Sequence, residues 1–316
     1  MKIVLTEPLG IPAETLRGLA APLEGQGHSF TAYDAPAETE AELVRRCAGA
    51  DILIIANHPL PGAAIRACPQ LQFVSVAFVG YDHVDVSACR ALGARIANTA
   101  GYCDDAVAEL AVGLALACLR RFPDCHRAVQ GGGSSAGLQG SELAGKTVGI
   151  IGTGAIGQRT AQLFSAFRCR LLGYSRRARP EAEALGIRYV SLPELLSSSD
   201  IVSLHTPLTE ETRGLLGREE LALMRPGAVL VNTARGPVVD SAALSEALKE
   251  GRIRAGIDVY EKDPPLPADH PLIGAPNLVC TPHIGFNTRE SIERRAAMAF
   301  ENVTAFLNGL PVRLVV

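Results

Sequence analysis

The sequence predicts an α/β protein with two doubly wound parallel-sheet domains. Short apolar runs alternate with helical patterns along almost all of the 316 residues. Most of these runs lack the in–out alternation of a sheet with one face in solvent, and strands covered by helices on both faces have this pattern. Repeated β-α units form parallel sheets. A chain of this length is also long enough for about two domains of ~150 residues each.

The apolar runs and the helical patterns between them set the order of the elements. The predicted strands are Ile3–Leu5, Ile52–Ile55, Phe73–Phe78, Val148–Ile151, Ile201–Leu204 and Ala228–Val231. The predicted helices are Ala37–Cys47, Cys103–Arg121, Ala155–Phe167, Ser241–Lys249 and Thr288–Leu307. Gly131–Gly140 has five glycines in ten residues and no periodicity. We interpret it as a flexible connection that marks the start of a second folding unit, and the last helix as free to return to the first domain.

Composition excludes several classes of protein. The formal net charge is −3, so the charge balance favours neither a nucleic acid nor an anionic membrane as partner. The longest nearly apolar stretch, Ala106–Leu119, is interrupted by Glu109 and is shorter than the ~20 residues of a membrane span. The first residues lack the apolar core of a signal peptide.

The 8 cysteines include no CxxC pair, and we interpret them as mostly buried free thiols of a cytoplasmic protein without a metal site.

A glycine-rich turn joins the strand that ends at Ile151 to the helix that follows it. The turn has the pattern GxGxxG, in which the first glycine makes the tight turn and the second lets the backbone approach a pyrophosphate. The third glycine lets the helix pack on the strand, and the helix N-terminus faces the anion. We therefore predict a dinucleotide site at Gly152, Gly154, Ala155, Ile156 and Gly157.

The next predicted strand ends at Tyr174 and is followed by a basic turn. No acidic residue is present there to bind the ribose 2′-hydroxyl of NAD. Ser175, Arg176 and Arg177 can instead hydrogen-bond or pair with a 2′-phosphate. The turn predicts a preference for NADP, with NAD as a possible second cofactor; the alternative is a solvated basic turn.

Further motifs follow in order along the chain. They are His205-Thr206-Pro207-Leu208, Asn232-Thr233-Ala234-Arg235-Gly236, Asp258–Pro264 and Thr281-Pro282-His283-Ile284-Gly285, with Val79-Gly80-Tyr81-Asp82 and Ala106-Val107-Ala108-Glu109 upstream. This set resembles the D-isomer-specific 2-hydroxyacid dehydrogenases, of the glyoxylate or hydroxypyruvate reductase type, over nearly the whole chain.

The resemblance implies a domain organisation. A discontinuous, flavodoxin-like substrate domain would comprise residues 1–98 and 288–316, and a central Rossmann cofactor domain residues 99–287. The active site would lie between them, and the long helix and the last helix would be the crossovers. Members of this family typically dimerise through the cofactor domain, so we expect a homodimer.

The reaction chemistry points to three catalytic residues. Reduction of a 2-oxo acid needs a clamp for the carboxylate and carbonyl, and the planar guanidinium of Arg235 suits that role. His283 suits the proton donor, because imidazole titrates near neutrality. In the family a Glu just before a Pro usually assists the His; here that position is Asp263, one methylene shorter. Glu261 is the competing candidate, but the register against Pro264 favours Asp263.

The resemblance also assigns binding residues. Asp258 corresponds to the aspartate that holds the nicotinamide carboxamide, and Thr206, Thr233 and Ala234 correspond to residues that line the cofactor. The backbone N–H groups of Val79 and Gly80 correspond to the loop that binds the substrate carboxylate, together with Arg235 and His283. Cys103 stands where many relatives carry Asn.

The substrate class is less determined than the reaction. Relatives that act on phosphoglycerate carry an Arg after the third strand, whereas this chain has Ala56-Asn57-His58-Pro59-Leu60. We therefore predict a small 2-oxo acid such as glyoxylate or hydroxypyruvate as substrate and a D-2-hydroxy acid as product. The alternatives are a phosphoglycerate dehydrogenase-like activity, a nicotinamide-sensing corepressor-like binding protein, and an unrelated Rossmann dehydrogenase.

Overall fold

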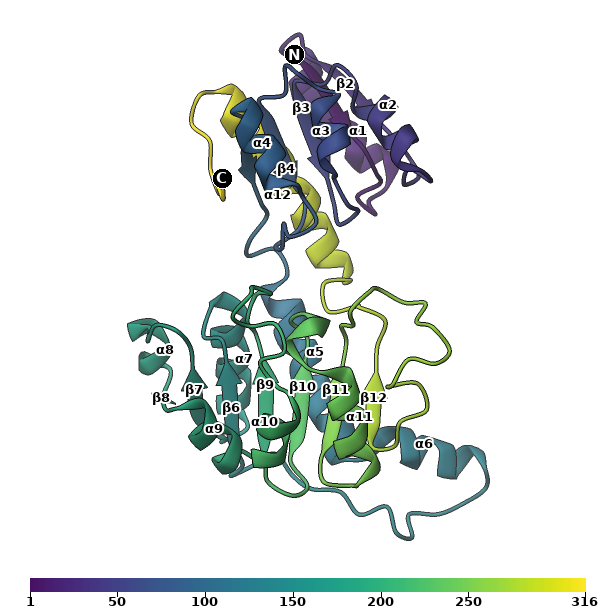
Figure 1. The fold of residues 1–316 in the computed structure, drawn as a ribbon, viewed down its shortest axis with the longest axis vertical. Coiled ribbons are helices and arrows are strands. Elements are labelled where there is room, and N and C mark those ends of the chain that lie inside the picture. The colour runs from purple at the N-terminus through teal and green to yellow at the C-terminus, as the bar shows by residue number, and fades with distance from the viewer. The chain divides into compact units, whose positions relative to one another are not determined.

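The computed structural model describes residues 1–316, which fold into two compact units. Unit 1 consists of Met1–Cys103 and Thr288–Val316, and unit 2 consists of Asp104–Asn287. The chain thus leaves unit 1 at Cys103 and returns to it at Thr288 (Figure 1). Unit 1 is discontinuous in sequence, while unit 2 is one continuous segment.

Unit 1 is built around a parallel sheet of five strands in the order β2-β1-β3-β4-β5. Its strands are β1 (Lys2–Leu5), β2 (Ser29–Ala32), β3 (Ile52–Ile55), β4 (Phe73–Val76) and β5 (Arg95–Ala97). This is the flavodoxin-like order, in which the direction of strand addition reverses between β1 and β3. The flavodoxin-like fold expected for this part of the chain is therefore confirmed.

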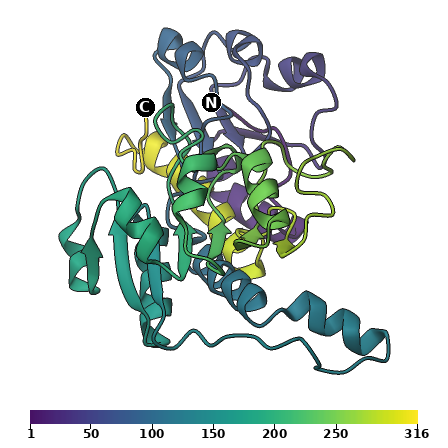
Figure 2. The same ribbon diagram turned by 60° about the horizontal axis from the view of Figure 1, so that its bottom comes forward.

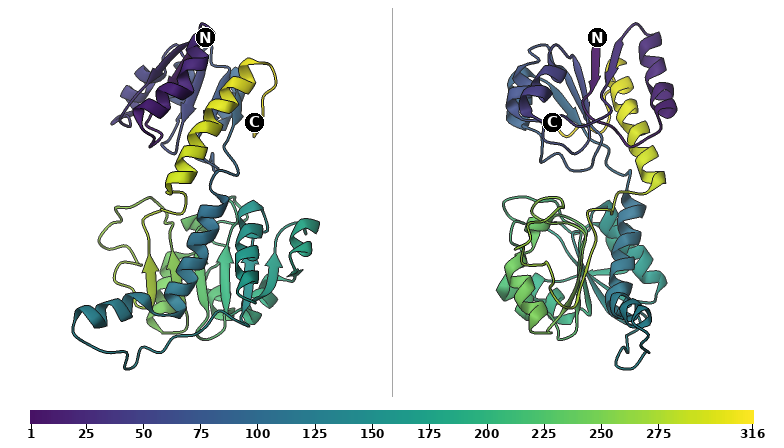
Figure 3. Two further views of the ribbon diagram at one scale, coloured as in Figure 1. Left: turned by 180° about the vertical axis from the view of Figure 1, so that it is seen from behind. Right: turned by 90° about the vertical axis from the view of Figure 1, so that its right-hand side faces the viewer.

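Helices cover both faces of this sheet. They are α1 (Ala13–Gly25), α2 (Glu40–Cys47), α3 (Gly62–Arg66), α4 (Val86–Leu92) and α12 (Arg289–Leu307). Helices α1 and α12 lie on one face, and α2, α3 and α4 lie on the other (Figure 3). The last helix supplies core residues: Phe306 stacks on Phe73 with ring centroids 4.5 Å apart, and the Ser75 hydroxyl donates to the Ala299 carbonyl at 2.9 Å. The final segment therefore completes unit 1, as the sequence predicted.

Unit 2 contains a parallel sheet of seven strands in the order β12-β11-β10-β9-β6-β7-β8. Its strands are β6 (Thr147–Ile151), β7 (Arg170–Tyr174), β8 (Ile187–Tyr189), β9 (Ile201–Leu204), β10 (Val229–Asn232), β11 (Arg254–Ile257) and β12 (Leu278–Cys280). Read from β6, this is the Rossmann order with one added edge strand, and the reversal falls between β6 and β9.

The strands of unit 2 contribute to two separate hydrophobic cores. The helices of this unit are α5 (Asp104–Leu119), α6 (Phe122–Gln130), α7 (Ala155–Ala166), α8 (Pro180–Ala184), α9 (Leu192–Ser198), α10 (Arg218–Leu223) and α11 (Ser241–Lys249). Val229 and Val231 pack in the core with α5 and α7, whereas Leu230 packs with α9, α10 and α11. Both faces are thus buried, which explains why the apolar runs show no alternation.

The glycine-rich segment Gly131–Gly140 contains no helix or strand, but it lies inside unit 2. The expectation that it marks the start of a second folding unit is therefore wrong, because unit 2 begins earlier, with α5. Helix α6 and this segment extend away from the sheet of unit 2 (Figures 1 and 2).

All eight cysteines are free thiols, and no helix has both the length and the hydrophobicity to cross a bilayer.

Candidate functional site

The turn between β6 and α7 has glycines at the positions where the backbone requires them. Gly152 has φ = +94°, and a Cβ added to it would lie 2.5 Å from the His205 carbonyl oxygen. A Cβ on Gly157 would collide with the Gly152 carbonyl oxygen, so this glycine allows the helix to approach the strand. A Cβ on Gly154 would meet nothing within 4 Å. The open side of Gly154 is therefore available to a ligand.

A pocket of about 270 Å³ lies beside this turn, at the carboxyl ends of the strands where the strand order reverses. Segments following β6, β7 and β9 line it; among them are Gly152, Gly154, Ser175, Arg176, Arg179, His205, Thr206 and Glu211. Helix α7 begins beside the pocket without a side-chain cap at Gly154. Its first N–H groups and its dipole therefore favour an anion there.

The basic turn after β7 contributes a different set of side chains from the one that the sequence indicated. Ser175 and Arg176 line the pocket, as expected, but Arg179 lines it where Arg177 does not. The Arg176 guanidinium forms an ion pair with Glu211, with 3.0 Å between Nη1 and Oε2. Arg179 ends the same basic run but was not among the predicted site residues; its backbone N–H donates to the Tyr189 hydroxyl at 3.1 Å.

Two buried polar atoms, in the segments after β9 and β10, have no partner in the protein. They are Nδ1 of His205 and Oγ1 of Thr233. The other ring nitrogen of His205 lies 2.8 Å from the Ser203 hydroxyl, and burial lowers the pKa of His205 to about 3. His205 is therefore neutral near pH 7. Thr206, the residue predicted from the same motif, also lines the pocket, and its hydroxyl donates to the Pro207 carbonyl at 2.9 Å.

The predicted residues Arg235 and Ala234 lie in the loop that follows β10, and a buried amide fixes this loop. The Asn232 side chain donates to the Arg235 carbonyl at 3.0 Å and accepts from the Ala234 N–H at 3.0 Å. Gly236 follows with no room for a Cβ, because it abuts the backbone of Tyr260. Asn232 was not among the predicted residues, since the motif shows its identity but not its contacts.

Asp258, at the end of β11, is buried and holds the loop that carries His283. Its carboxylate accepts from the Thr281 hydroxyl at 2.6 Å and from the N–H groups of Ile284 and Gly285, both at 2.8 Å. The His283 N–H donates to the Asp258 carbonyl at 2.8 Å. His283 itself has φ = +56°, a left-handed conformation that few residues adopt without such support. The structure therefore shows Asp258 positioning the histidine loop.

The imidazole of His283 faces a carboxylate from the loop before it. His283 Nδ1 lies 2.7 Å from Oδ1 of Asp263. Glu261, the competing candidate, lies in a different network: it accepts from the Ser241 hydroxyl at 2.6 Å and contacts His270 Nε2 at 3.0 Å. Burial acts to raise the pKa of Glu261, but the hydrogen bonds from Ser241 and His270 lower it overall. The shorter side chain at position 263 thus reaches the histidine.

In unit 1, Val79 and Gly80 lie in the loop after β4. The Asn98 side chain donates to the Val79 carbonyl at 2.7 Å. The loop after β3 is joined to this region by the Leu60 N–H, which donates to the His83 carbonyl at 2.9 Å. Cys103 is buried at the end of the first segment of unit 1.

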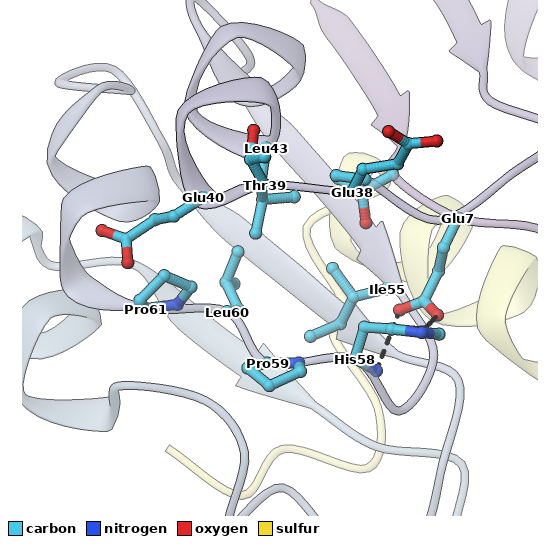
Figure 4. Close-up of a pocket in the computed structure, with 12 residues that line it drawn as sticks. Glu7, Glu38, Thr39, Glu40, Leu43, Ile55, His58, Pro59, Leu60 and Pro61 are labelled. Carbon is cyan, nitrogen blue, oxygen red and sulfur yellow. Dashed lines mark hydrogen bonds and ion pairs between the residues drawn. The ribbon is translucent and has the colours of Figure 1, made fainter.

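A second pocket lies at the carboxyl ends of β1 and β3, within unit 1. The buried carboxylate of Glu7 accepts from the N–H groups of Ala56 and His58 at 2.9 and 3.2 Å and pairs with the His58 imidazole (Figure 4). Glu38 and Glu40 line the same pocket. The Glu7–His58 pair fixes the loop after β3, and three acidic side chains, Glu7, Glu38 and Glu40, line the pocket beside this loop.

The residues of unit 2 fit a bound dinucleotide. The open side of Gly154 and the uncapped start of α7 suit a pyrophosphate, and the unpartnered Nδ1 of His205 and Oγ1 of Thr233 can bond to a polar ligand. The family model described as "D-isomer specific 2-hydroxyacid dehydrogenase, NAD binding domain" matches residues 112–285. The chain belongs to the D-isomer specific 2-hydroxyacid dehydrogenases. It is therefore an oxidoreductase that acts on the CH–OH group of 2-hydroxy acids with a nicotinamide cofactor.

Members of the family align with most of this chain. A glyoxylate reductase of Thermofilum pendens is 40% identical over 284 residues, covering 87% of this chain and 84% of the relative. A hydroxypyruvate reductase of Blautia hydrogenotrophica is 35% identical over 93% of both chains. A D-3-phosphoglycerate dehydrogenase of Archaeoglobus fulgidus is 37% identical, but only 52% of its length is aligned. The crystal structure of the TT0316 protein from Thermus thermophilus superposes over all of both chains with a TM-score of 0.89 at 38% identity.

Proposed function

We propose that this dehydrogenase reduces glyoxylate or hydroxypyruvate to the corresponding D-2-hydroxy acid. The observation that carries the proposal is the pairing of His283 with Asp263 at 2.7 Å. In this pair His283 follows β12 and Asp263 follows β11, while Arg235 follows β10 and the glycine turn follows β6. Because the strands are parallel, all of these lie at the same edge of one sheet. Similarity to the glyoxylate and hydroxypyruvate reductases supports the choice of substrates.

The catalytic roles follow from the chemistry of these side chains. When bound, the nicotinamide cofactor supplies a hydride to the carbonyl carbon. Arg235 binds the substrate carboxylate and carbonyl oxygen through its fork of N–H donors, which fixes orientation and stabilises the developing negative charge. His283 Nε2 donates a proton to that oxygen, while Asp263 holds Nδ1 and balances the positive charge on the ring. Val79 and Gly80 in unit 1 remain predicted ligands of the carboxylate.

The acidic surroundings of the loop after β3 support a small substrate over a phosphorylated one. The segment Ala56–Leu60 contains no Arg or Lys. Its His58 is already paired with Glu7, and the pocket beside it is also lined by Glu38 and Glu40 (Figure 4). A phosphate placed there would face like charges. This favours glyoxylate or hydroxypyruvate over phosphoglycerate.

The pocket beside the glycine turn supports NADPH as the preferred cofactor. Ser175, Arg176 and Arg179 line it, so a hydroxyl and two guanidinium groups, of which that of Arg176 is paired with Glu211, can bind a ribose 2′-phosphate. The other cofactor-binding residues predicted from the sequence are kept in this proposal. Arg179 is added to them because it lines the nucleotide pocket, whereas Arg177 does not line that pocket.

The protein is proposed to be a cytoplasmic homodimer. Helix α6 buries none of its own residues, and Phe122 and Val129 on it are 53% and 70% exposed. Apolar side chains displayed in this way favour burial against a second copy of the chain. Sedimentation velocity of the wild type and of Phe122→Asp tests this: a monomeric wild type would contradict it.

A substrate screen tests the proposed activity directly. Purified protein is assayed with NADPH and with NADH against glyoxylate, hydroxypyruvate, pyruvate, 2-oxobutyrate, phenylpyruvate and, in the oxidative direction, 3-phosphoglycerate. We expect the highest kcat/KM with glyoxylate or hydroxypyruvate and NADPH. Activity confined to 3-phosphoglycerate would replace the proposed substrate class, and background rates with every pair would contradict the enzymatic role.

A further inference from the structure

One of the two guanidinium groups that line the nucleotide pocket, that of Arg176, already has a partner. Arg176 and Glu211 both line the nucleotide pocket, and their Nη1 and Oε2 atoms are 3.0 Å apart. Arg176 follows β7 and Glu211 lies in the segment after β9, so the pair joins two sides of the pocket. The partner is therefore a part of the pocket and not a chance neighbour on the same turn.

The segment that carries Glu211 has a defined conformation. The Thr209 N–H donates to the Thr212 hydroxyl at 2.8 Å, and that hydroxyl donates to the Pro207 carbonyl at 2.7 Å. The Gly214 N–H donates to the Pro237 carbonyl at 2.8 Å. These bonds hold the backbone on either side of position 211, so the carboxylate has a fixed origin from which to reach Arg176.

We propose that Glu211 is a specificity-determining residue for the cofactor, acting at the adenosine ribose. Its carboxylate competes with a 2′-phosphate for Arg176 and repels that phosphate, which carries about −1.5 to −2 charges at neutral pH. With NAD, the neutral ribose leaves the ion pair intact and offers its 2′-hydroxyl to a carboxylate. The acid that is missing after β7 is thus supplied by another segment, and the enzyme accepts both cofactors. The inference rests on the proposed preference for NADPH, and it states that Glu211 keeps this preference over NADH small.

The size of the effect follows from the exposure of the pair. Both side chains are about 70% exposed, so water screens the interaction and the competition is modest. Removing the carboxylate frees Arg176 and ends the repulsion of the phosphate. We expect NADPH to bind about two- to fivefold more tightly, and NADH to bind equally well or more weakly.

Equilibrium binding separates this inference from the catalytic roles. Dissociation constants of NADPH, NADH and the fragment 2′,5′-ADP are measured by titration calorimetry for the wild type, Glu211→Gln and Glu210→Gln. Glu210 is the neighbouring exposed carboxylate and does not line the pocket, so it controls for net charge. Tighter binding of NADPH and 2′,5′-ADP to Glu211→Gln alone supports the proposal. Unchanged binding by Glu211→Gln, or an equal gain in Glu210→Gln, overturns it.

A double-mutant cycle tests whether Glu211 acts through Arg176. It also separates a failure of this inference from a failure of the proposed NADPH preference. If Glu211 acts by occupying Arg176, most of the gain disappears in Arg176→Ala/Glu211→Gln relative to Arg176→Ala. A gain that is fully retained there would contradict competition for Arg176. If Arg176→Ala leaves the dissociation constant of NADPH unchanged, Arg176 does not bind the 2′-phosphate, and this part of the proposed function is contradicted. If Arg176→Ala weakens NADPH binding but Glu211→Gln is silent, only the further inference fails.

Discussion

At the scale of single residues, the candidate catalytic groups are oriented by neighbours that the motifs do not single out. Asn232 fixes the backbone around Arg235 with two hydrogen bonds, and Asp258 fixes the loop of His283 with four. Sequence patterns show the residues that could react, because their chemistry is specific. They do not show which buried polar group satisfies which N–H, because that pairing exists only in the folded backbone.

The distinction between Asp263 and Glu261 gives a direct test of the proton donor. Asp263→Asn removes the negative charge beside His283 while keeping the size of the side chain. We expect the kcat for reduction of the 2-oxo acid to fall about tenfold or more, because the ring loses its orienting and charge-balancing partner. The dissociation constant of NADPH should not change. Glu261→Gln is the matched control, since Glu261 contacts Ser241 and His270. A silent Asp263→Asn with an impaired Glu261→Gln would exchange the two roles.

Substituting the clamp separates charge from geometry. Arg235→Lys keeps the positive charge but loses the planar fork. We expect kcat/KM to fall by an amount equal to about 2–4 kcal/mol in transition-state stabilisation, with NADPH binding nearly unchanged. The control is Arg225→Lys, because Arg225 pairs with Asp200 ahead of β10 and outside the site. Steady-state kinetics with glyoxylate gives the answer, and normal kinetics in Arg235→Lys would remove this residue from catalysis.

The half-buried His205, whose Nδ1 atom is fully buried, predicts a loss of stability in acid. Its folded pKa of about 3 lies below the unfolded value of about 6.5. The unfolded chain therefore binds more protons between these values, and stability falls as the pH drops below about 6.5. From pH 7 to pH 5 this amounts to about 2 kcal/mol, or a decrease in Tm of roughly 4–8 °C.

Scanning calorimetry at both pH values measures that decrease. His205→Gln should show a smaller fall in Tm between pH 7 and pH 5 than the wild type. His126→Gln, which alters an exposed histidine on α6, should fall as the wild type does. An equal fall in all three proteins would assign the acid sensitivity to other groups.

At the scale of elements, the two glycines Gly157 and Gly154 of the β6–α7 unit have different roles: the first is needed for folding and the second for binding the cofactor. Gly157→Ala places a methyl group against the Gly152 carbonyl, so we expect a loss of about 1–3 kcal/mol of stability. Gly154→Ala meets no protein atom within 4 Å, so its Tm should stay near the wild-type value while NADPH binding weakens at least tenfold. Thermal unfolding with and without NADPH distinguishes the two. Normal NADPH binding by Gly154→Ala would show that the pyrophosphate does not approach this turn.

Elements with a strong apolar pattern were predicted closely from the sequence, and the others were not. The strands Ile52–Ile55 and Ile201–Leu204 and the helix Ser241–Lys249 have the predicted bounds. The edge strand β2 was missed because its side chains are mostly exposed, and β8 and β12 have only three residues each. Helix α6 was missed because it buries no residue. Short or exposed elements are defined by their neighbours, so local sequence carries little signal for them.

The candidate site shows the same limit. The motifs and the resemblance proposed Arg235, His283 and Asp263, and the structure pairs His283 with Asp263 at 2.7 Å. They were not enough to separate Arg177 from Arg179, since which side of a turn faces a pocket depends on its three-dimensional path. Glu211 was missed for a related reason: its partner Arg176 is 35 residues away in the chain.

At the scale of the whole molecule, unit 1 depends on two segments that are far apart in the sequence. Residues Ala296, Ala299, Phe300 and Val303 of α12 share one core with β1, β3 and α1. Unit 2 lies between these segments in the chain but contains its own two cores. Folding of unit 1 therefore requires the last helix, whereas unit 2 holds all of its core residues in one stretch.

A core substitution in α12 tests this division. Phe300 is 3% exposed and contacts the ring of Phe30, with centroids 5.6 Å apart. Phe300→Ala removes a buried ring, and we expect unit 1 to lose about 3–5 kcal/mol of stability. Hydrogen exchange should show the loss of protection confined to residues 1–103 and 288–316, while NADPH still protects the β6–α7 turn of unit 2. Phe167→Ala, at a position of unit 2 that is 41% exposed, is the matched control and should leave unit 1 unchanged. A uniform loss of protection across both units would show that the chain unfolds as one cooperative body, because the two units would then share their stability through the segments that join them.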